Sequence, residues 1–486
     1  MYVAPERASQ SHFRDLLSQC RIALFAIDEA HCVSEWGHDF RPDYRLLRPL
    51  MDQFPDVPRL ALTATADAHT RSDILTQLGI APEGLIVAGF DRPNIRYTIR
   101  PRDSLTQQLR RLLAENLGPG IVYAQTRAAT ERLAASLSDG KREVRCYHAG
   151  LPPETRAANQ AAFVESENMV ICATVAFGMG IDKPDVRFVA HAGLPKSIES
   201  YYQETGRAGR DGDPSVAHLF WGADDFARAR MRIGEVGEAR QQGERTRLAA
   251  LGALVETAGC RRAILLRHFG ENPPETCGNC DNCLHPPKAV DATVVAQKYL
   301  SAVARTRQMY GSGYIESILT GQSSERSRER GHDALSVFGI VEGEEAALLK
   351  PVHRALLVRG ALLPTEHGGL MLGPEARGFL KGEHPLDLVI PPKRAGGKRG
   401  SRGAGSSQEL NPVGDPLFDA LRALRRDLAK DNQVPPYVIF HDSVLRDMAG
   451  LRPQTRALLG ELPGIGAKKL EAYGDAFLEV IRQYDR

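Results

Sequence analysis

The chain has 486 residues, of which 42% are apolar and 25% are charged, and its formal net charge is +2. This length allows three or more domains, and this composition is ordinary for a globular protein. No apolar run reaches the ~18 residues that a membrane-spanning helix needs, and no signal peptide opens the sequence. Because the charges nearly cancel, composition points to no particular partner, and the function must be read from local motifs.

Short apolar runs typical of β-strands recur through the first half of the chain, with helical patterns between many of them. Alternation of strand and helix over about 200 residues predicts an α/β fold, in which helices flank parallel sheets. A second α/β unit begins near Tyr97. The predicted strands are residues 22–27, 60–62, 121–123, 144–147, 170–172, 188–191 and 216–221.

The second half of the chain is mostly helical. An Arg-rich helical stretch follows Ala223, and a later group of helices ends in a short strand pair around residues 366–369. Residues 391–412 are rich in Gly, Ser and basic side chains, which is typical of a flexible linker. We therefore expect six segments, with the boundaries 1–96, 97–223, 224–287, 288–390, 391–412 and 413–486.

Two acids follow the first predicted strand, at Asp28 and Glu29. The carboxyl edge of a parallel sheet is where ligands of α/β folds bind. Asp28 suits a carboxylate that holds Mg²⁺ beside nucleotide phosphates, and Glu29 suits a residue that orients or deprotonates the attacking water. Taken alone, two solvated acids at a strand end would be the commoner interpretation. The aromatic residues that follow, Trp36, Phe40 and Tyr44, change the balance.

Residues 28–44 closely resemble the DEAH box and the aromatic-rich loop of RecQ-family DNA helicases, which couple ATP hydrolysis to 3′→5′ unwinding. The resemblance implies a catalytic role for His31 and DNA contacts for Trp36, Phe40 and Arg41. An aromatic ring can stack on a single-stranded base, although Trp36 could equally be a core anchor. The threonine-rich strand end at residues 62–66 is similar to helicase motif III.

Residues 203–212 are the strongest motif of the second α/β unit. We expect Arg207 and Arg210, spaced by three at a helix start, to project in one direction. A guanidinium can neutralise charge on a transferring γ-phosphoryl group. With residues 121–127, 147–151 and 173–182, this segment resembles motifs IV to VI of superfamily 2 helicases. The resemblance implies that ATP and Mg²⁺ are bound by Asp28, Gln203, Gly180, Asp182, Arg207 and Arg210.

Four cysteines, Cys260, Cys277, Cys280 and Cys283, have the spacing C-x16-C-x2-C-x2-C. Two successive x2 spacings bring three thiolates within reach of one ion, and the first cysteine can complete a tetrahedron. An iron–sulfur cluster and a redox disulfide pair are the alternatives that spacing leaves open. The matching RecQ element is a helical platform with structural zinc, which favours zinc.

Residues 289–382 resemble the winged-helix domain of RecQ proteins. Arg326, Arg328 and Arg330 lie in or near a helical stretch, where Arg forks suit phosphate contacts, although a solvated helix face is an equally good interpretation. His367 falls where the family has a strand-separating hairpin, but the predicted hairpin is very short. That role is therefore an open expectation.

The C-terminal segment resembles the HRDC domain of RecQ helicases and RNase D. Residues 462–469 resemble a helix–Gly-turn–helix approach to a phosphate, with Lys468 at the contact. Because this segment is electrically neutral, a weak or structure-selective DNA contact is expected, and binding of protein partners is the competing expectation.

The phosphate-binding loop G-x-x-x-x-G-K-[ST] does not occur in the sequence. The chain opens on a segment that resembles the middle of the first RecQ motor lobe. The resemblance implies RecA-like parallel-sheet lobes, the first one incomplete, then a zinc-binding helical platform, a winged helix and a small all-α HRDC domain. We expect an ATP-dependent DNA helicase of repair and recombination in a bacterial-like cytoplasm, associated with the nucleoid. The alternative is a catalytically inactive DNA-binding fragment.

Overall fold

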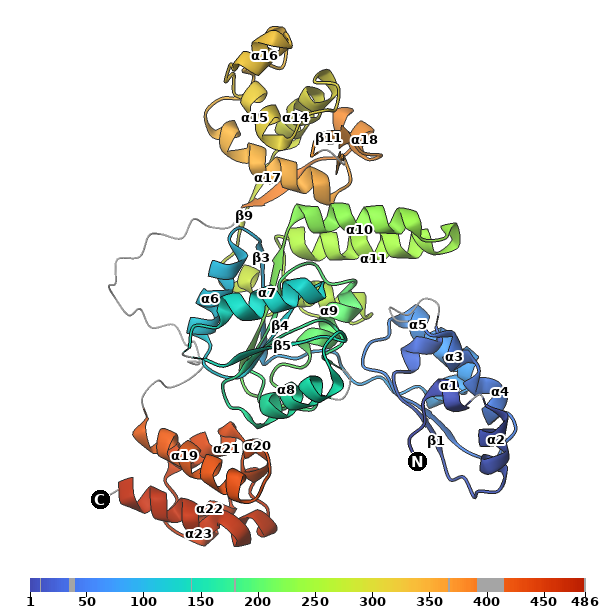
Figure 1. The fold of residues 1–486 in the computed structure, drawn as a ribbon, viewed down its shortest axis with the longest axis vertical. Helices are drawn as coiled ribbons and strands as arrows, with labels where there is room; N and C mark the ends of the chain where they lie inside the picture. The colour runs from blue at the N-terminus through green and yellow to red at the C-terminus, as the bar shows by residue number, and fades with distance from the viewer. Residues whose placement is uncertain are drawn as a thin grey trace. The chain divides into compact units, whose positions relative to one another are not determined.

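The computed structural model describes residues 1–8, 10–34, 40–140, 142–178, 181–365, 368–390 and 415–484. The chain, drawn as a ribbon in Figure 1, divides into two compact units. The first unit comprises Met1–Asp91, Pro195–Gln203 and Gly222–Pro392. The second unit comprises Arg92–Leu194, Glu204–Trp221 and Lys393–Arg486. Among the described residues, no helix is long and apolar enough to cross a membrane.

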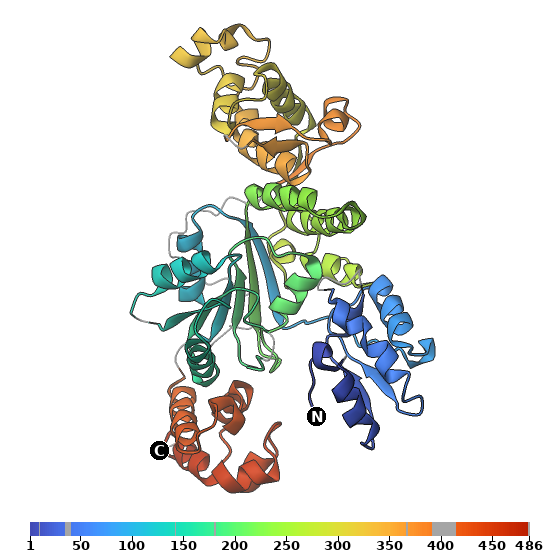
Figure 2. The ribbon, with the colours of Figure 1, turned by 45° about the vertical axis from the view of Figure 1, so that its right-hand side comes forward.

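A six-stranded, fully parallel sheet forms the centre of the second unit (Figure 2). Its strand order is β3-β8-β7-β4-β6-β5. Parallel strands that are covered on both faces are continuous apolar runs, and β6 and β7 are buried along their whole length. The strands are β3 Ile95–Pro101, β4 Gly120–Tyr123, β5 Val144–Tyr147, β6 Val170–Ala173, β7 Phe188–His191 and β8 Ser215–Trp221.

Helices connect these strands and bury apolar side chains against the sheet. Leu109 and Leu112 of α6 and Leu133 and Leu137 of α7 share one core with the strands. Thr126 caps α7, since its side chain accepts a hydrogen bond from Ala129 N. These helices are α6 Leu105–Glu115, α7 Arg127–Leu137 and α8 Pro153–Glu165. Helix α9 Ile198–Thr205 follows β7 along the chain, and most of it belongs to the first unit.

The N-terminal part of the first unit contains a two-stranded parallel sheet, β1–β2. Its core lies between the sheet and the neighbouring helices and includes Ile27, Val33, Met51 and Leu78. The elements are α1 Pro5–Ala8, α2 Ser11–Ser18, β1 Phe25–Ile27, the 3₁₀ helix η1 Ala30–Val33, α3 Pro42–Arg45, α4 Leu47–Met51, β2 Arg59–Ala61, α5 Ala68–Leu78 and the 3₁₀ helix η2 Pro82–Gly84.

The rest of the first unit contains two helical groups. The first group is α10 Ala223–Glu235, α11 Glu238–Glu256, α12 Arg261–His268 and α13 Asp281–Leu284. The second group has its own core and two short antiparallel strand pairs, β9–β12 and β10–β11. Its elements are β9 Lys288–Asp291, α14 Thr293–Arg305, α15 Ser312–Leu319, α16 Glu325–Glu329, the 3₁₀ helix η3 His332–Ala334, α17 Glu344–Val358, β10 Leu362–Pro364, β11 Leu370–Leu372, α18 Ala376–Leu380 and β12 Asp387–Ile390.

The C-terminal helices of the second unit enclose a separate apolar core around Phe440 and Phe477. They are α19 Pro416–Asp431, α20 Pro436–Ile439, α21 Asp442–Leu451, α22 Arg456–Gly460 and α23 Ala467–Tyr484. The expected helix–Gly-turn–helix is present between α22 and α23, with Gly464 at φ 90°.

Each strand predicted from the sequence is present, but two expectations need correction. Strand β3, which is an edge strand of the six-stranded sheet, and the β9–β12 pair were not among the predicted strands. Arg207 and Arg210 do not lie at a helix start. They lie in a turn that follows the end of α9 at Thr205, because positive φ angles at Gly209 and Gly212 give the backbone a left-handed course. The predicted linker, residues 391–412, lies outside the described residues.

Candidate functional site

The two acids of the first unit lie directly after β1, as the sequence predicts. Asp28 is exposed, and its Oδ1 accepts a hydrogen bond from Glu29 N at 2.8 Å. Glu29 has a left-handed backbone, with φ 49° and ψ 43°. This conformation is uncommon for a residue with a side chain and persists only where the surroundings enforce it. The turn that carries both carboxylates is therefore a constrained one.

A hydrogen-bonded group surrounds Glu29. His31 is 2% exposed, and its Nδ1 lies 2.9 Å from Thr63 Oγ1 and 3.3 Å from Glu29 Oε2. Gln203 donates from Nε2 to Glu29 Oε1 at 3.1 Å. Thr63 follows β2 and Glu29 follows β1, so His31 connects the ends of two neighbouring strands. The contacts of His31 thus link the Glu29 carboxylate to the threonine-rich strand end.

The arginine turn of the second unit is held by its own unit. Arg210 Nη1 lies 2.8 Å from Asp182 Oδ1, and Arg207 donates to the carbonyl oxygen of Gly178. A Cβ atom at Gly178 would lie 2.5 Å from Arg207 Nη2, so a larger residue there would displace the guanidinium group. The structure therefore groups Asp182, Arg207 and Arg210 in the second unit. Gly180, another expected nucleotide-binding residue, lies outside the described residues.

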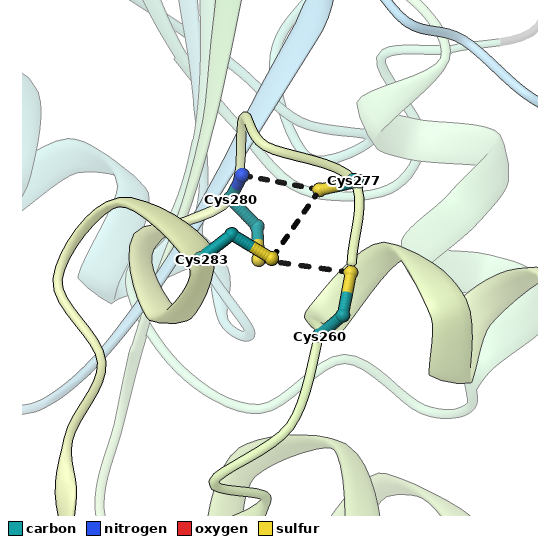
Figure 3. Close-up of side chains that lie close together, drawn as sticks. All are labelled: Cys260, Cys277, Cys280 and Cys283. Atoms are coloured by element: carbon teal, nitrogen blue, oxygen red, sulfur yellow. Dashed lines mark hydrogen bonds between the residues drawn. The ribbon is translucent and has the colours of Figure 1, made fainter. Parts of the chain in front are cut away.

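The four cysteines come together in the first unit (Figure 3). Their Sγ atoms all lie within 4.8 Å of one another. Cys260 precedes α12, Cys283 lies on α13, and the other two lie on the loop between these helices. Four thiol donors at this spacing fit a tetrahedral structural zinc ion. The hydrogen bond between the Cys277 and Cys280 thiols lowers the pKa of Cys280 and raises that of Cys277, so Cys280 is the one of these two that more readily forms a thiolate.

Two polar residues that the sequence analysis missed hold the cysteine loops in place. Arg261 is buried and donates to Leu254 O at 2.6 Å, to Asp281 Oδ1 at 3.2 Å and to Asn282 Oδ1 at 3.3 Å. Asn282 donates to the carbonyl oxygens of Thr257 and Gly259, at 2.8 Å each. Both residues are sequence neighbours of cysteines, and that adjacency is the only signal that could have found them.

Arg326, an expected DNA contact, lies on α16 over two aromatic rings. Its guanidinium carbon is 5.0 Å from the Tyr310 ring centroid and 5.6 Å from that of Tyr314. The two rings are stacked, with centroids 4.3 Å apart. Cation–π contacts of this kind orient a guanidinium without neutralising it. Arg328 is also exposed on α16, so both arginines are available to an anionic ligand.

The residues after the 3₁₀ helix η1 are only partly described, because Trp36 lies outside the described residues. The Phe40 ring is approached by two guanidinium carbons, of Arg45 at 5.1 Å and of Arg240 at 5.8 Å. The Arg41 backbone N–H donates to Cys32 O at 2.9 Å. Arg41 is therefore held against the 3₁₀ helix η1, which follows the two acids.

The remaining expected DNA contacts are Lys468 and His367. Lys468 is exposed in the first turn of α23, whereas its neighbour Lys469 lies over the Phe440 ring at 5.7 Å. His367 lies outside the described residues, between the strands of the β10–β11 hairpin. Thr365 and Gly368 flank that position, and Gly368 N donates to Thr365 O at 3.1 Å.

The parallel sheet and its arginine turn define the class of the protein as a helicase-type motor. Residues 104–212 match the model of the helicase conserved C-terminal domain. Residues 223–284 match the RecQ zinc-binding model, 286–396 the RQC domain and 415–481 the HRDC domain.

Three relatives match along the whole chain, and each is described as an ATP-dependent DNA helicase RecQ. Those of Pasteurella multocida and Haemophilus influenzae are 40% identical, over 77% and 79% of their own lengths. That of Bacillus subtilis is 34% identical over 80% of its length. The chain belongs to the RecQ family of ATP-dependent DNA helicases, with a structural Zn²⁺ and with Mg²⁺ accompanying ATP.

Proposed function

We propose that the protein unwinds DNA with 3′→5′ polarity in repair and recombination. One observation supports the ATP-driven motor in this proposal: Glu29 contacts both His31 and Gln203, and His31 in turn contacts Thr63. A motor must link the carboxylate that orients the attacking water to neighbouring strands and loops. Asp28 would hold Mg²⁺, Glu29 would orient the water, and Arg207 and Arg210 would neutralise charge on the transferring phosphoryl group.

The polarity can be tested with two DNA duplexes that differ only in carrying a 3′ or a 5′ single-stranded tail. With ATP and Mg²⁺, the 3′-tailed duplex should be unwound and the 5′-tailed one should not. Glu29→Gln should abolish unwinding but not DNA binding, because it removes only the water-orienting carboxylate. Equal unwinding of both duplexes would contradict the polarity. Because the motif G-x-x-x-x-G-K-[ST] does not occur in the sequence, the assay also includes an extended chain, in which a segment with this motif precedes residue 1.

A second candidate function is favoured by the missing loop. Without the backbone cradle and lysine that hold the β- and γ-phosphates, the γ-phosphoryl group should not be aligned for attack. Residues 1–486 alone would then bind DNA without hydrolysing ATP. Phosphate release should be measured with single-stranded DNA and Mg²⁺, with Glu29→Gln as the contamination control. Robust hydrolysis that Glu29→Gln removes would exclude this candidate.

Coupling of DNA to hydrolysis is proposed for Trp36, Phe40 and Arg41. Trp36 follows closely on the two acids in the sequence, and an aromatic ring can stack on a single-stranded base. In the extended chain, Trp36→Ala should lower the DNA-stimulated ATPase rate and leave DNA affinity nearly unchanged. An unchanged stimulated rate would remove the coupling role, and loss of zinc or of folding would instead favour a core anchor.

DNA binding is proposed to come mainly from residues 224–390, with help from the basic linker at residues 391–412. Arg326 and Arg328 would contact DNA there, and His367 is a candidate strand-separating residue. Lys468 would add a weak contact from residues 413–486, and these residues would also be the place for protein partners. The six segments expected from the sequence would be the domains, and the protein would act in the cytoplasm at the nucleoid.

A further inference from the structure

The turn between α14 and α15, residues 307–311, has an unusual backbone. Arg307 and Gln308 both have φ 59°, so two consecutive residues with side chains are left-handed. Each such residue costs free energy unless its surroundings hold it in place. Both side chains are exposed, and the following Met309 is 68% exposed. A constrained turn thus ends in a large apolar side chain that faces solvent.

The β10–β11 hairpin holds this turn in place. Leu372 N donates to Gln308 Oε1 at 2.8 Å, and Leu370 N donates to Tyr310 O at 2.9 Å. A Cβ atom at Gly369 would lie 2.7 Å from Met309 O, so the hairpin backbone lies directly against the turn. The turn and the hairpin therefore form one rigid edge of the winged helix.

Two arginines belong to the turn that carries Met309 or contact it. Arg307 is two residues away, and Arg326 lies over Tyr310, the next residue along the chain. Arg307 and Arg330 both act electrostatically on His332, whose pKa burial and these arginines lower. His332 Nδ1 in turn lies 2.7 Å from the Tyr314 hydroxyl. An exposed apolar side chain on a rigid turn, beside arginines, has the chemistry of a wedge that enters between base pairs while cations hold the flanking phosphates.

We propose that Met309 is a DNA wedge: it packs against the terminal base pair of a duplex at a single-strand junction, while Arg307 and Arg326 bind the adjacent phosphates. This proposal rests on the proposed DNA-helicase function and adds a contact beside the hairpin tip. Met309 weakens stacking at the junction, and the arginines supply the affinity. Removing the methionine side chain should therefore reduce opening of the terminal base pair more than it reduces binding.

The test uses the full chain and a tailed duplex with 2-aminopurine at the terminal base pair, without nucleotide. Binding of the unsubstituted chain should raise the fluorescence, because the base loses its stacking. Met309→Ala should make that rise about threefold smaller, with the dissociation constant changed by no more than about twofold. Met309→Leu, which keeps an apolar side chain of similar volume, should restore the rise. Met231→Ala is the matched control, since Met231 is 59% exposed on α10.

The outcomes separate the wedge from the proposed function. If the unsubstituted chain does not bind the duplex, the proposed DNA-binding function fails. If it binds and opens the junction, but Met309→Ala opens it equally well, the wedge proposal is overturned and the proposed function stands. His367→Ala is measured alongside, and loss of the signal in that variant alone would assign the opening to the hairpin tip and overturn the wedge.

Discussion

His31 and Thr63 join the ends of two neighbouring strands, with His31 Nδ1 2.9 Å from Thr63 Oγ1. The imidazole is buried and also contacts the Glu29 carboxylate at 3.3 Å. A buried polar group that loses its partner keeps the cost of its lost hydration. The hydroxyl of Thr63 should therefore be important for the order of the turn that carries the acids.

Thr63→Val removes this hydroxyl and keeps the branched shape of the side chain. We expect the local stability of residues 28–34 to fall by ~1 kcal/mol, because one buried hydrogen bond is lost. Hydrogen–deuterium exchange of that segment, followed by mass spectrometry, should show faster exchange. Thr76→Val is the matched control, since its hydroxyl bonds only to Ser72 O within α5. Unchanged exchange in Thr63→Val would show that the contact is not energetically significant.

Zinc should be bound at one ion per chain by the four cysteines. Cys280→Ser should lose the metal and lower the solubility, since a structural zinc ion supplies folding free energy directly. Elemental analysis of purified protein measures the metal directly. Cys20→Ser, at an exposed cysteine outside the cluster, should leave the zinc content unchanged. Iron in place of zinc, or well-folded protein without metal, would contradict this prediction.

DNA affinity should fall steeply with salt, because arginines that neutralise phosphates release counterions. Arg326→Ala should weaken binding and reduce the slope of log K against log salt by about one. Lys468→Ala should have a smaller effect, since the C-terminal helices are proposed to make a weak contact. Fluorescence anisotropy over a salt series measures both quantities. Arg132→Ala on α7 is the control. If its salt slope fell as much as that of Arg326→Ala, the loss of any positive charge would explain the result and Arg326 would not be a specific DNA contact.

The winged helix should lose stability as the pH falls below about 6.5. Burial lowers the pKa of His353 on α17 to about 4, and its Nε2 is buried without a hydrogen-bond partner among the described residues. Between these two pKa values, His353 is protonated in the unfolded chain and neutral in the folded chain. The free energy of unfolding therefore decreases as the pH falls. We expect a loss of ~2 kcal/mol between about pH 7 and pH 5.

His353→Phe should remove most of this pH dependence, because a phenyl ring can keep the packing against Tyr299 without titrating. The His353 and Tyr299 rings are stacked with centroids 5.7 Å apart. Hydrogen exchange of α14 and α17 at the two pH values measures the effect within the winged helix. If the unsubstituted protein and the His353→Phe variant showed equal pH dependence, a titrating group other than His353 would be its cause.

The sequence predicted the strands whose residues are buried on both faces, because such strands are unbroken apolar runs. Val170–Ala173 is an example, with all four residues buried. The edge strand β3 was not predicted, because Arg96 and Arg100 interrupt its apolar residues and because it ends in Pro101. A spacing of three residues suggested a helix for Arg207 and Arg210, but the glycines around them form a turn.

The four cysteines could be predicted as one site because their spacing alone restricts where the thiols can lie. Arg261 and Asn282 could not, since their role depends on which backbone carbonyls the fold brings near them. The contact of His31 with Thr63 also depends on strand pairing, since 32 residues separate the two in the sequence. Tertiary proximity of this kind leaves no periodic signal in a single sequence.

The pairing of Arg210 with Asp182 means that a candidate arginine finger already has an anionic partner. The Asp182 side chain is 88% exposed and that of Arg210 is 38% exposed, so dissolved ions screen this pair readily. A nucleotide that recruits Arg210 must compete with the aspartate, and screening makes that competition easier. A rise in ionic strength would then have two opposed effects on the protein. It would lower the affinity for DNA, and it would also free Arg210 from Asp182 to reach the nucleotide.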